Sequence, residues 1–257
     1  MFIKYYYLVR HGETIMNKEH KRQGEEGALS PNGIAEVEEV AKRIAGMRID
    51  KMFVSPFERT RETAGIINSH IKLSEDKIII TPLLGERKNP TSIVGKTYDD
   101  PEAKSFVDMM DKSIHEPDLR ISDEENFQDL KNRAIAAQKY LIENGVKRNL
   151  CVTHGIFLKM FLSTLLYGET LTVRQYAEMG LYNSADNAAL TLIKYDPKKK
   201  ILGPIKKFFD NILDDKEDLD EEEQIKNMNK PILDKYSPWE ILAYNDYTRD
   251  GLSRLKI

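Results

Sequence analysis

Four short polar motifs follow apolar segments that have the composition of buried strands. In chain order they contain Arg10-His11, Ser55 with Arg59, Glu86, and His154. If the four segments are parallel strands of one sheet, their carboxyl ends meet at one edge, where open α/β sheets bind ligands. The spacing therefore predicts a single polar site made from motifs far apart in the chain.

These side chains suit a dianionic phosphate ester. Arginine guanidinium groups bind phosphate oxygens in pairs and stay charged. A neutral imidazole can attack phosphorus, and neighbouring arginines favour the neutral form by lowering its pKa. A carboxylic acid can protonate the leaving oxygen. Such chemistry needs no metal, and the sequence shows no zinc-type spacing of His and Cys, so no metal and no cofactor is expected.

The elements that position these motifs alternate between strands and helices. The expected strands are Tyr5–Val9, Met52–Val54, Ile78–Ile80, Leu150–Thr153 and Ala188–Tyr195. The expected helices begin at Ser30-Pro31, after Ser55-Pro56 and near Phe127, and the first and third end at Gly46 and Gly145. This order predicts an α/β fold, a three-layer αβα sandwich with a mainly parallel central sheet.

Two regions interrupt this pattern. The polar, proline-containing stretch 87–125 predicts an irregular lid or a small helical insertion. The tail changes to basic, aromatic and then acidic composition. We therefore expect a catalytic domain over 1–202, with the insertion inside it, and a helical or acidic extension over 203–257.

Composition limits the partners. Over 257 residues the formal charge is −3, which gives no general attraction to nucleic acid or to an anionic bilayer. No apolar run is long enough to span a membrane, and a single cysteine excludes an internal disulfide. We expect a cytoplasmic protein with no nucleic-acid or membrane partner.

The motifs resemble those of the histidine phosphatase superfamily, which includes the cofactor-dependent phosphoglycerate mutases. The similarity spans about Tyr5 to Tyr195 and rests on ordered segments rather than on one tripeptide. They are Leu8–Thr14, Asn17, Gln23-Gly24, Leu29-Ser30 with Gly33, Ser55-Pro56 with Arg59 and Thr63-Ala64, Leu84–Arg87, Thr153–Gly155 and Asn183.

The resemblance implies a role for each matching residue. His11 would be the phosphorylated nucleophile and Glu86 the proton donor. Arg10, Arg59 and His154 would form the phosphate pocket, with help from Asn17. Gly155 is added from the residues themselves, because the start of a helix after His154 favours an anion.

Some positions depart from the family pattern or have a second interpretation. Lys21 stands where the family often has arginine, with Arg22 beside it, and either could contact phosphate. The segment after Glu86 is atypical. Ser55 is as well explained as a helix N-cap as by a catalytic role. Arg61 is expected to face water.

Three functions remain open on the sequence. The first is a phosphatase that hydrolyses phosphate monoesters through a phosphohistidine on His11, acting on a phosphorylated metabolite or phosphoprotein. The second is phosphoglycerate mutase-type phosphoryl transfer, and the atypical segment after Glu86 argues against it. The third is a phosphoprotein-binding module without turnover, which the complete set of His11, Glu86 and His154 disfavours.

Overall fold

A six-stranded sheet forms the centre of the fold in the computed structural model, which describes residues 2–112, 116–179, 185–199 and 237–246. The strand order is β3-β2-β4-β1-β5-β6. The first four strands of the chain run parallel, and β5 is antiparallel to β1. The strands are β1 (Lys4–Arg10), β2 (Lys51–Val54), β3 (Ile78–Ile80), β4 (Arg148–Thr153), β5 (Leu190–Tyr195) and β6 (Trp239–Asp246).

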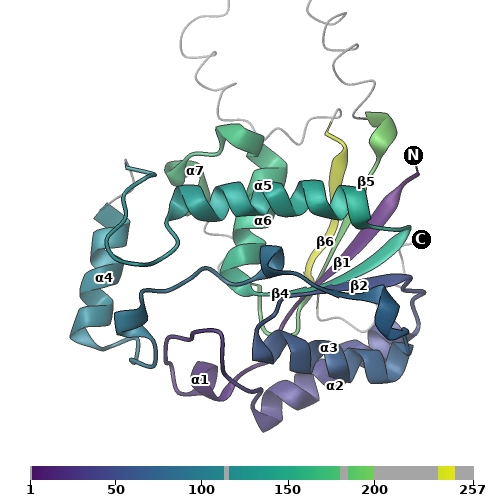
Figure 1. The fold of residues 1–257 in the computed structure, drawn as a ribbon, viewed down its shortest axis with the longest axis horizontal. Coiled ribbons are helices and arrows are strands. Elements are labelled where there is room, and N and C mark those ends of the chain that lie inside the picture. The colour runs from purple at the N-terminus through teal and green to yellow at the C-terminus, as the bar shows by residue number, and fades with distance from the viewer. Residues whose placement is uncertain (1, 113–115, 180–184, 200–236, 247–257) are drawn as a thin grey trace, which may run out of the picture.

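Helices cover both faces of this sheet (Figure 1). Their bounds are α1 (Ile15–Lys18), α2 (Pro31–Ala45), α3 (Glu58–Ile71), α4 (Pro101–Lys112), α5 (Phe127–Asn144), α6 (Gly155–Tyr167) and α7 (Val173–Glu178). Helices α2 and α3 pack on one face, and α5 and α6 pack on the other. The predicted three-layer αβα sandwich with a mainly parallel sheet is therefore confirmed.

Strand β1 has no polar face because its successive side chains pack against helices on opposite sides of the sheet. Tyr6 and Leu8 pack with α5 and α6, whereas Tyr7 and Val9 pack with α2 and α3. A strand buried on both sides needs apolar side chains in both directions. The aromatic and β-branched run thus places β1 at the centre of the sheet, with its carboxyl end fixed between two cores.

The loop after β1 is held by a close approach to α2. Ser30 caps this helix by accepting a hydrogen bond from the Gly33 N–H. A Cβ atom at Gly33 would lie 2.0 Å from the carbonyl oxygen of Glu13. Only glycine lets the helix start pack this closely against the loop that follows His11.

The predicted insertion contains a short 3-10 helix at Thr91–Ile93 and the helix α4. Ile93, Ala103 and Phe106 form a small apolar cluster of their own. This segment lies beside the carboxyl ends of the strands (Figure 1).

Strand β6 was not predicted from the sequence. Its residues fall in the segment 203–257 that was expected to be a helical or acidic extension, yet they pair antiparallel with β5 and add an edge to the main sheet. The Trp239 ring packs against the rings of Tyr195 and Tyr6, with centroids 4.9 and 5.6 Å away. The described part of the tail thus belongs to the core. The rest of the extension predicted over 203–257 lies outside the described residues.

Across the described ranges, no helix combines the length and the apolar composition needed to cross a bilayer.

We predict that Trp239→Ala lowers the free energy of unfolding by about 3–5 kcal/mol, because it leaves a cavity beside Tyr6 and Tyr195. Urea denaturation measures this loss, and Trp239→Phe serves as a control that keeps a ring and loses less. A change below about 1 kcal/mol would show that β6 contributes little to the core.

Candidate active site

The predicted motifs meet at the carboxyl edge of the sheet. Arg10 ends β1, Ser55 follows β2 and His154 follows β4. A cavity of about 150 Å³ lies at this edge. The predicted residues that line it are Arg10, His11, Asn17, Arg59, Glu86 and Gly155. The structure therefore brings together side chains that are separated by up to 145 positions in the chain, from Arg10 to Gly155.

Positive charge dominates the cavity wall. Arg10, Lys21, Arg22 and Arg59 line it, against the single carboxylate of Glu86. The Nε atoms of the three arginines are buried and have no hydrogen-bond partner among the described residues. Buried donors without acceptors are costly, so the wall is suited to an anion that supplies oxygen acceptors.

The ring of His11 is held in one tautomer. Its Nδ1 lies 2.7 Å from the carbonyl oxygen of Gly12. A carbonyl oxygen can only accept a hydrogen bond, so Nδ1 carries the proton. In the neutral ring, Nε2 then has a free lone pair. His11 is 2% exposed and lines the cavity, which makes Nε2 an available nucleophile.

The surroundings keep this ring neutral. Burial lowers the pKa of His11 well below its ordinary value, and the positive charges of Arg59 and Arg10 lower it further. The hydrogen bond to Gly12 acts in the opposite direction. Burial also lowers the pKa of Arg59 to about 10, so its guanidinium still carries its charge at neutral pH.

His154 lies beside His11 rather than in the cavity wall. The two ring centroids are 5.2 Å apart, and the Nε2 of His154 is 2.7 Å from the Ser55 hydroxyl. That hydroxyl accepts the Phe57 N–H, at 3.4 Å, and is free to donate its proton to Nε2. The proton of His154 then resides on Nδ1, which has no partner within the described ranges.

The start of α3 excludes one of the two interpretations of Ser55. Helix α3 begins at Glu58 with Phe57 as its N-cap, and its start has no side-chain cap. Ser55 is therefore not the N-cap of α3. Its fully buried hydroxyl orients His154 instead.

Glu86 reaches the cavity from the loop after β3. Its Oε1 accepts hydrogen bonds of 2.9 Å from the N–H groups of Phe157 and Arg87, and its Oε2 accepts one of 3.3 Å from Ile156. The positive end of α6 thus binds this carboxylate, where the sequence analysis expected it to hold a ligand anion. Gly155, the first residue of α6, still lines the cavity.

The other candidate residues from the sequence differ in their partners and in their exposure. The guanidinium groups of Arg10 and Arg59 each donate one hydrogen bond to a backbone carbonyl, of Ala185 and Gly24. Lys21 and Arg22 both line the cavity, but Lys21 forms an ion pair with Glu19 at 2.7 Å. Arg61 is exposed, as expected. Asn183 lies outside the described residues.

Comparison with known proteins identifies the family of the chain. The family model of the histidine phosphatase superfamily (branch 1) matches residues 6–205. The chain belongs to this superfamily. A relative from Proteus mirabilis named "Probable phosphoglycerate mutase GpmB" is 32% identical over 167 residues, which cover 62% of this chain and 74% of the relative.

Two solved structures share the fold of this chain. A mycobacterial glucosyl-3-phosphoglycerate phosphatase aligns with a TM-score of 0.63 and 18% identity, over 76% of this chain and 91% of that one. A phosphoserine phosphatase variant from Entamoeba histolytica, solved with phosphoserine, aligns with a TM-score of 0.58 and 23% identity, over 74% and 90%.

One residue that contacts two of the predicted site residues, Asn187, was missed from the sequence. The Asn187 amide donates to the His11 carbonyl at 3.3 Å and approaches the Asn17 side-chain oxygen at 3.5 Å. Asn187 precedes β5, which runs antiparallel to β1, so the start of β5 lies at the carboxyl edge of β1. A polar residue just before the last predicted strand was therefore the available signal.

A larger cavity of about 660 Å³ adjoins the first, and Gln23, Glu86 and Asn89 line both. Residues of the insertion form much of its wall. Both basic and acidic side chains line this larger cavity. Three of its basic side chains form ion pairs, namely Lys88–Asp123, Arg120–Asp129 and Arg133–Glu125.

No group of three or more His, Cys, Asp or Glu side chains gathers into a metal-binding set within the ranges that the structure describes.

We predict that stability falls with acid in part because of His11. Its pKa is near 6.5 in the unfolded chain and well below that in the folded one. Below about pH 6.5 the unfolded chain therefore binds a proton that the folded chain does not, and the free energy of unfolding falls as the pH drops. The contribution is up to about 1.4 kcal/mol per pH unit.

Urea denaturation at about pH 6 and about pH 5 tests this sign. The variant His11→Asn should lose less stability between the two values than the unchanged protein. Equal losses would show that the folded environment does not hold His11 neutral.

Proposed function

We propose that this protein is a phosphatase that hydrolyses phosphate monoesters, with His11 as the nucleophile. The observation that carries this proposal is the hydrogen bond from His11 Nδ1 to Gly12, which leaves Nε2 unprotonated in a cationic cavity. The substrate class is a phosphorylated metabolite or phosphoprotein, in line with the phosphatases of shared fold, whose names specify phosphorylated small molecules.

In the first step, the Nε2 lone pair of His11 attacks phosphorus and the bond from phosphorus to the ester oxygen breaks. Glu86, protonated for this step, gives its proton to the leaving alcohol. Both groups line the same cavity. A positioned acid of this kind contributes roughly 10²–10⁴-fold, and the contribution is greatest for alcohols that are poor leaving groups.

In the second step, water attacks the phosphohistidine. Glu86, now a carboxylate, accepts a proton from that water, and the phosphorus–nitrogen bond breaks to release inorganic phosphate and neutral His11. The proton taken from water restores the acid form of Glu86. The reaction balances with water as the only co-reactant.

The remaining predicted residues bind the transferred group. Arg10 and Arg59 supply charge and unpartnered Nε donors to its oxygens. Asn17 and the amino end of α6 at Gly155 complete the wall. His154, with its proton on Nδ1, places a neutral donor next to the His11 ring. Arg22 is a better phosphate contact than Lys21, which is paired with Glu19.

Charge pairing in the larger cavity favours hydrolysis over mutase chemistry. A mutase must hold a bisphosphate, and its second phosphate needs its own cations. Here Lys88, Arg120 and Arg133 are each engaged by a carboxylate, at 3.0, 2.5 and 2.6 Å, which leaves Arg87, with a buried and unpartnered Nε, as the one described cation of this wall without a carboxylate partner. The name of the Proteus mirabilis relative keeps phosphoglycerate mutase activity as the second candidate.

We predict that His11→Asn lowers kcat/KM for p-nitrophenyl phosphate by more than about 10³-fold, because the nucleophile is lost. Initial rates of nitrophenol release measure this, and circular dichroism checks that the variant folds. Retained hydrolysis by a folded variant would exclude His11 as the nucleophile. An unchanged protein that binds vanadate but hydrolyses no member of a substrate panel would instead be a binding module.

We also predict that the protein converts phosphoglycerate to glycerate and inorganic phosphate, or leaves it intact, rather than exchanging its two isomers. Isomer exchange is assayed with and without the bisphosphate primer. Exchange that depends on the primer and exceeds hydrolysis would assign the mutase function.

A further inference from the structure

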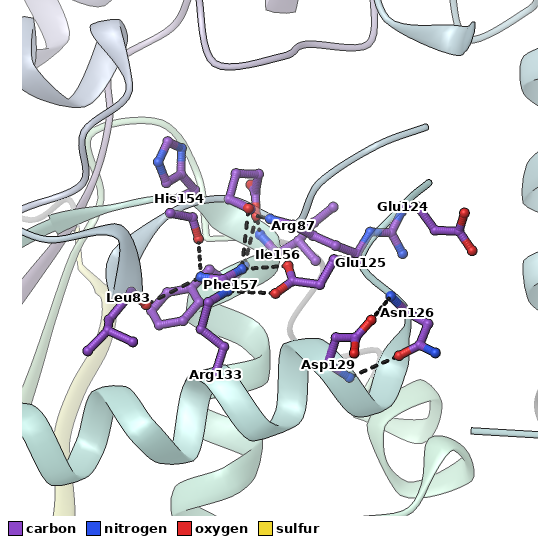
Figure 2. Close-up of polar contacts among 12 residues, drawn as sticks. Leu83, Arg87, Glu124, Glu125, Asn126, Asp129, Arg133, His154, Ile156 and Phe157 are labelled. Carbon is purple, nitrogen blue, oxygen red and sulfur yellow. Dashed lines mark hydrogen bonds and ion pairs between the residues drawn. The ribbon is translucent and has the colours of Figure 1, made fainter. Parts of the chain in front are cut away.

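Helix α5 carries an arginine, Arg133, that donates three hydrogen bonds to the loop that presents Glu86; Figure 2 draws this arginine with Leu83 and Glu125. Its NH1 group donates hydrogen bonds to the carbonyl oxygens of Gly85, at 2.8 Å, and Leu83, at 3.3 Å. Its NH2 group donates to the Glu86 carbonyl at 3.3 Å. Three carbonyls of one loop thus accept from a single guanidinium group.

The opposite edge of this guanidinium binds Glu125. The Nε and NH2 atoms of Arg133 each lie 2.6 Å from one carboxylate oxygen of Glu125. The two side chains are only 18% and 14% exposed. With these bonds, the five N–H donors of Arg133 match the five hydrogen bonds it makes, which fixes the plane of the group.

Among the described residues, no strand pairs through its backbone with this loop. It follows β3 and a 3-10 turn at Pro82–Leu84, and the Leu84 carbonyl is held by the Thr153 hydroxyl at 2.8 Å. Each carbonyl from Leu83 to Glu86 therefore accepts from the side chain of Arg133 or Thr153. Of the two side chains, only that of Arg133 reaches the backbone of Glu86 itself.

Arg133 is also tied to the contact that holds the Glu86 carboxylate. Its guanidinium lies 4.9 Å from the centroid of the Phe157 ring, and the Phe157 N–H donates to Glu86 Oε1 at 2.9 Å. Figure 2 shows Arg133 between the loop and α6, with Glu125 beside it. One arginine thus contacts the loop backbone, α6 and the segment that precedes α5.

We propose that Arg133, held by Glu125, is a positioning residue that sets the reach of Glu86 toward the leaving oxygen. The inference rests on the proposed role of Glu86 as the acid. A general acid must lie within hydrogen-bond reach of the oxygen it protonates, and a displacement of about 1 Å can cost about 10²-fold. A lysine side chain cannot form all five of these hydrogen bonds, because it has three donors and no planar guanidinium group.

The test is the dependence of rate on the leaving group. The value of kcat/KM reports phosphoryl transfer to the enzyme, and an acid matters most when the leaving alcohol is a weak acid. We expect Arg133→Met to lower kcat/KM for an alkyl phosphate by about 10²-fold and for p-nitrophenyl phosphate by a much smaller factor. Arg133→Lys and Glu125→Gln should give the same pattern with smaller losses.

Two reference variants give the outcomes their meaning. Glu86→Gln defines the steeper leaving-group dependence expected when the acid is absent, and adding Arg133→Met to it should not steepen that dependence further. Arg148→Met removes another partly buried arginine, paired with Asp50 at 3.2 Å at the start of β4. It should lower stability without changing the leaving-group dependence.

Two results together would overturn the positioning role of Arg133. They are equal losses on the two substrates in folded Arg133→Lys or Glu125→Gln protein, and a steep leaving-group dependence in Glu86→Gln. A shallow dependence in Glu86→Gln itself would remove Glu86 as the acid, and with it both the proposed protonation step and this inference.

Discussion

The chemistry of this site depends on one short hydrogen bond, from His11 Nδ1 to the carbonyl oxygen of Gly12. It assigns the proton to the nitrogen that contacts the backbone, so the other ring nitrogen, Nε2, keeps its lone pair. The bond is possible because the chain turns directly after β1, and this turn is fixed by the close approach of Gly33 to Glu13. A backbone constraint thus determines the reactivity of a side chain.

The same cationic wall serves two purposes. Arg10 and Arg59 supply donors for an anion, and their charges, together with burial, lower the pKa of His11 so that its nucleophilic form persists. Burial lowers the pKa of both arginines, and the negative charge of Glu86 acts in the opposite direction, which offsets part of the cost of gathering buried guanidinium groups. The carboxylate that we propose as the acid is therefore also part of the electrostatic balance of the site.

Sequence patterns predicted the fold where each segment carries its own signal. The doubly apolar run of β1, the Ser30 cap and the helix-ending Gly145 indicated their elements directly. Strand β6 was missed because Trp239–Asp246 mixes polar and apolar residues and pairs only with β5. Arg133 was missed because a charged residue on a helix ordinarily faces water, and only tertiary structure shows that its donors meet loop carbonyls.

The most direct test of the account is the position of the phosphoryl group on the enzyme during turnover. The protein is mixed with p-nitrophenyl phosphate, quenched in alkali and digested, and the phosphorylated peptide is located by mass spectrometry and its phosphohistidine isomer identified by nuclear magnetic resonance. The account predicts an acid-labile phosphoryl group on Nε2 of His11. Phosphorylation of Nδ1 of His11 or of His154, or hydrolysis without any phosphoenzyme, would contradict it.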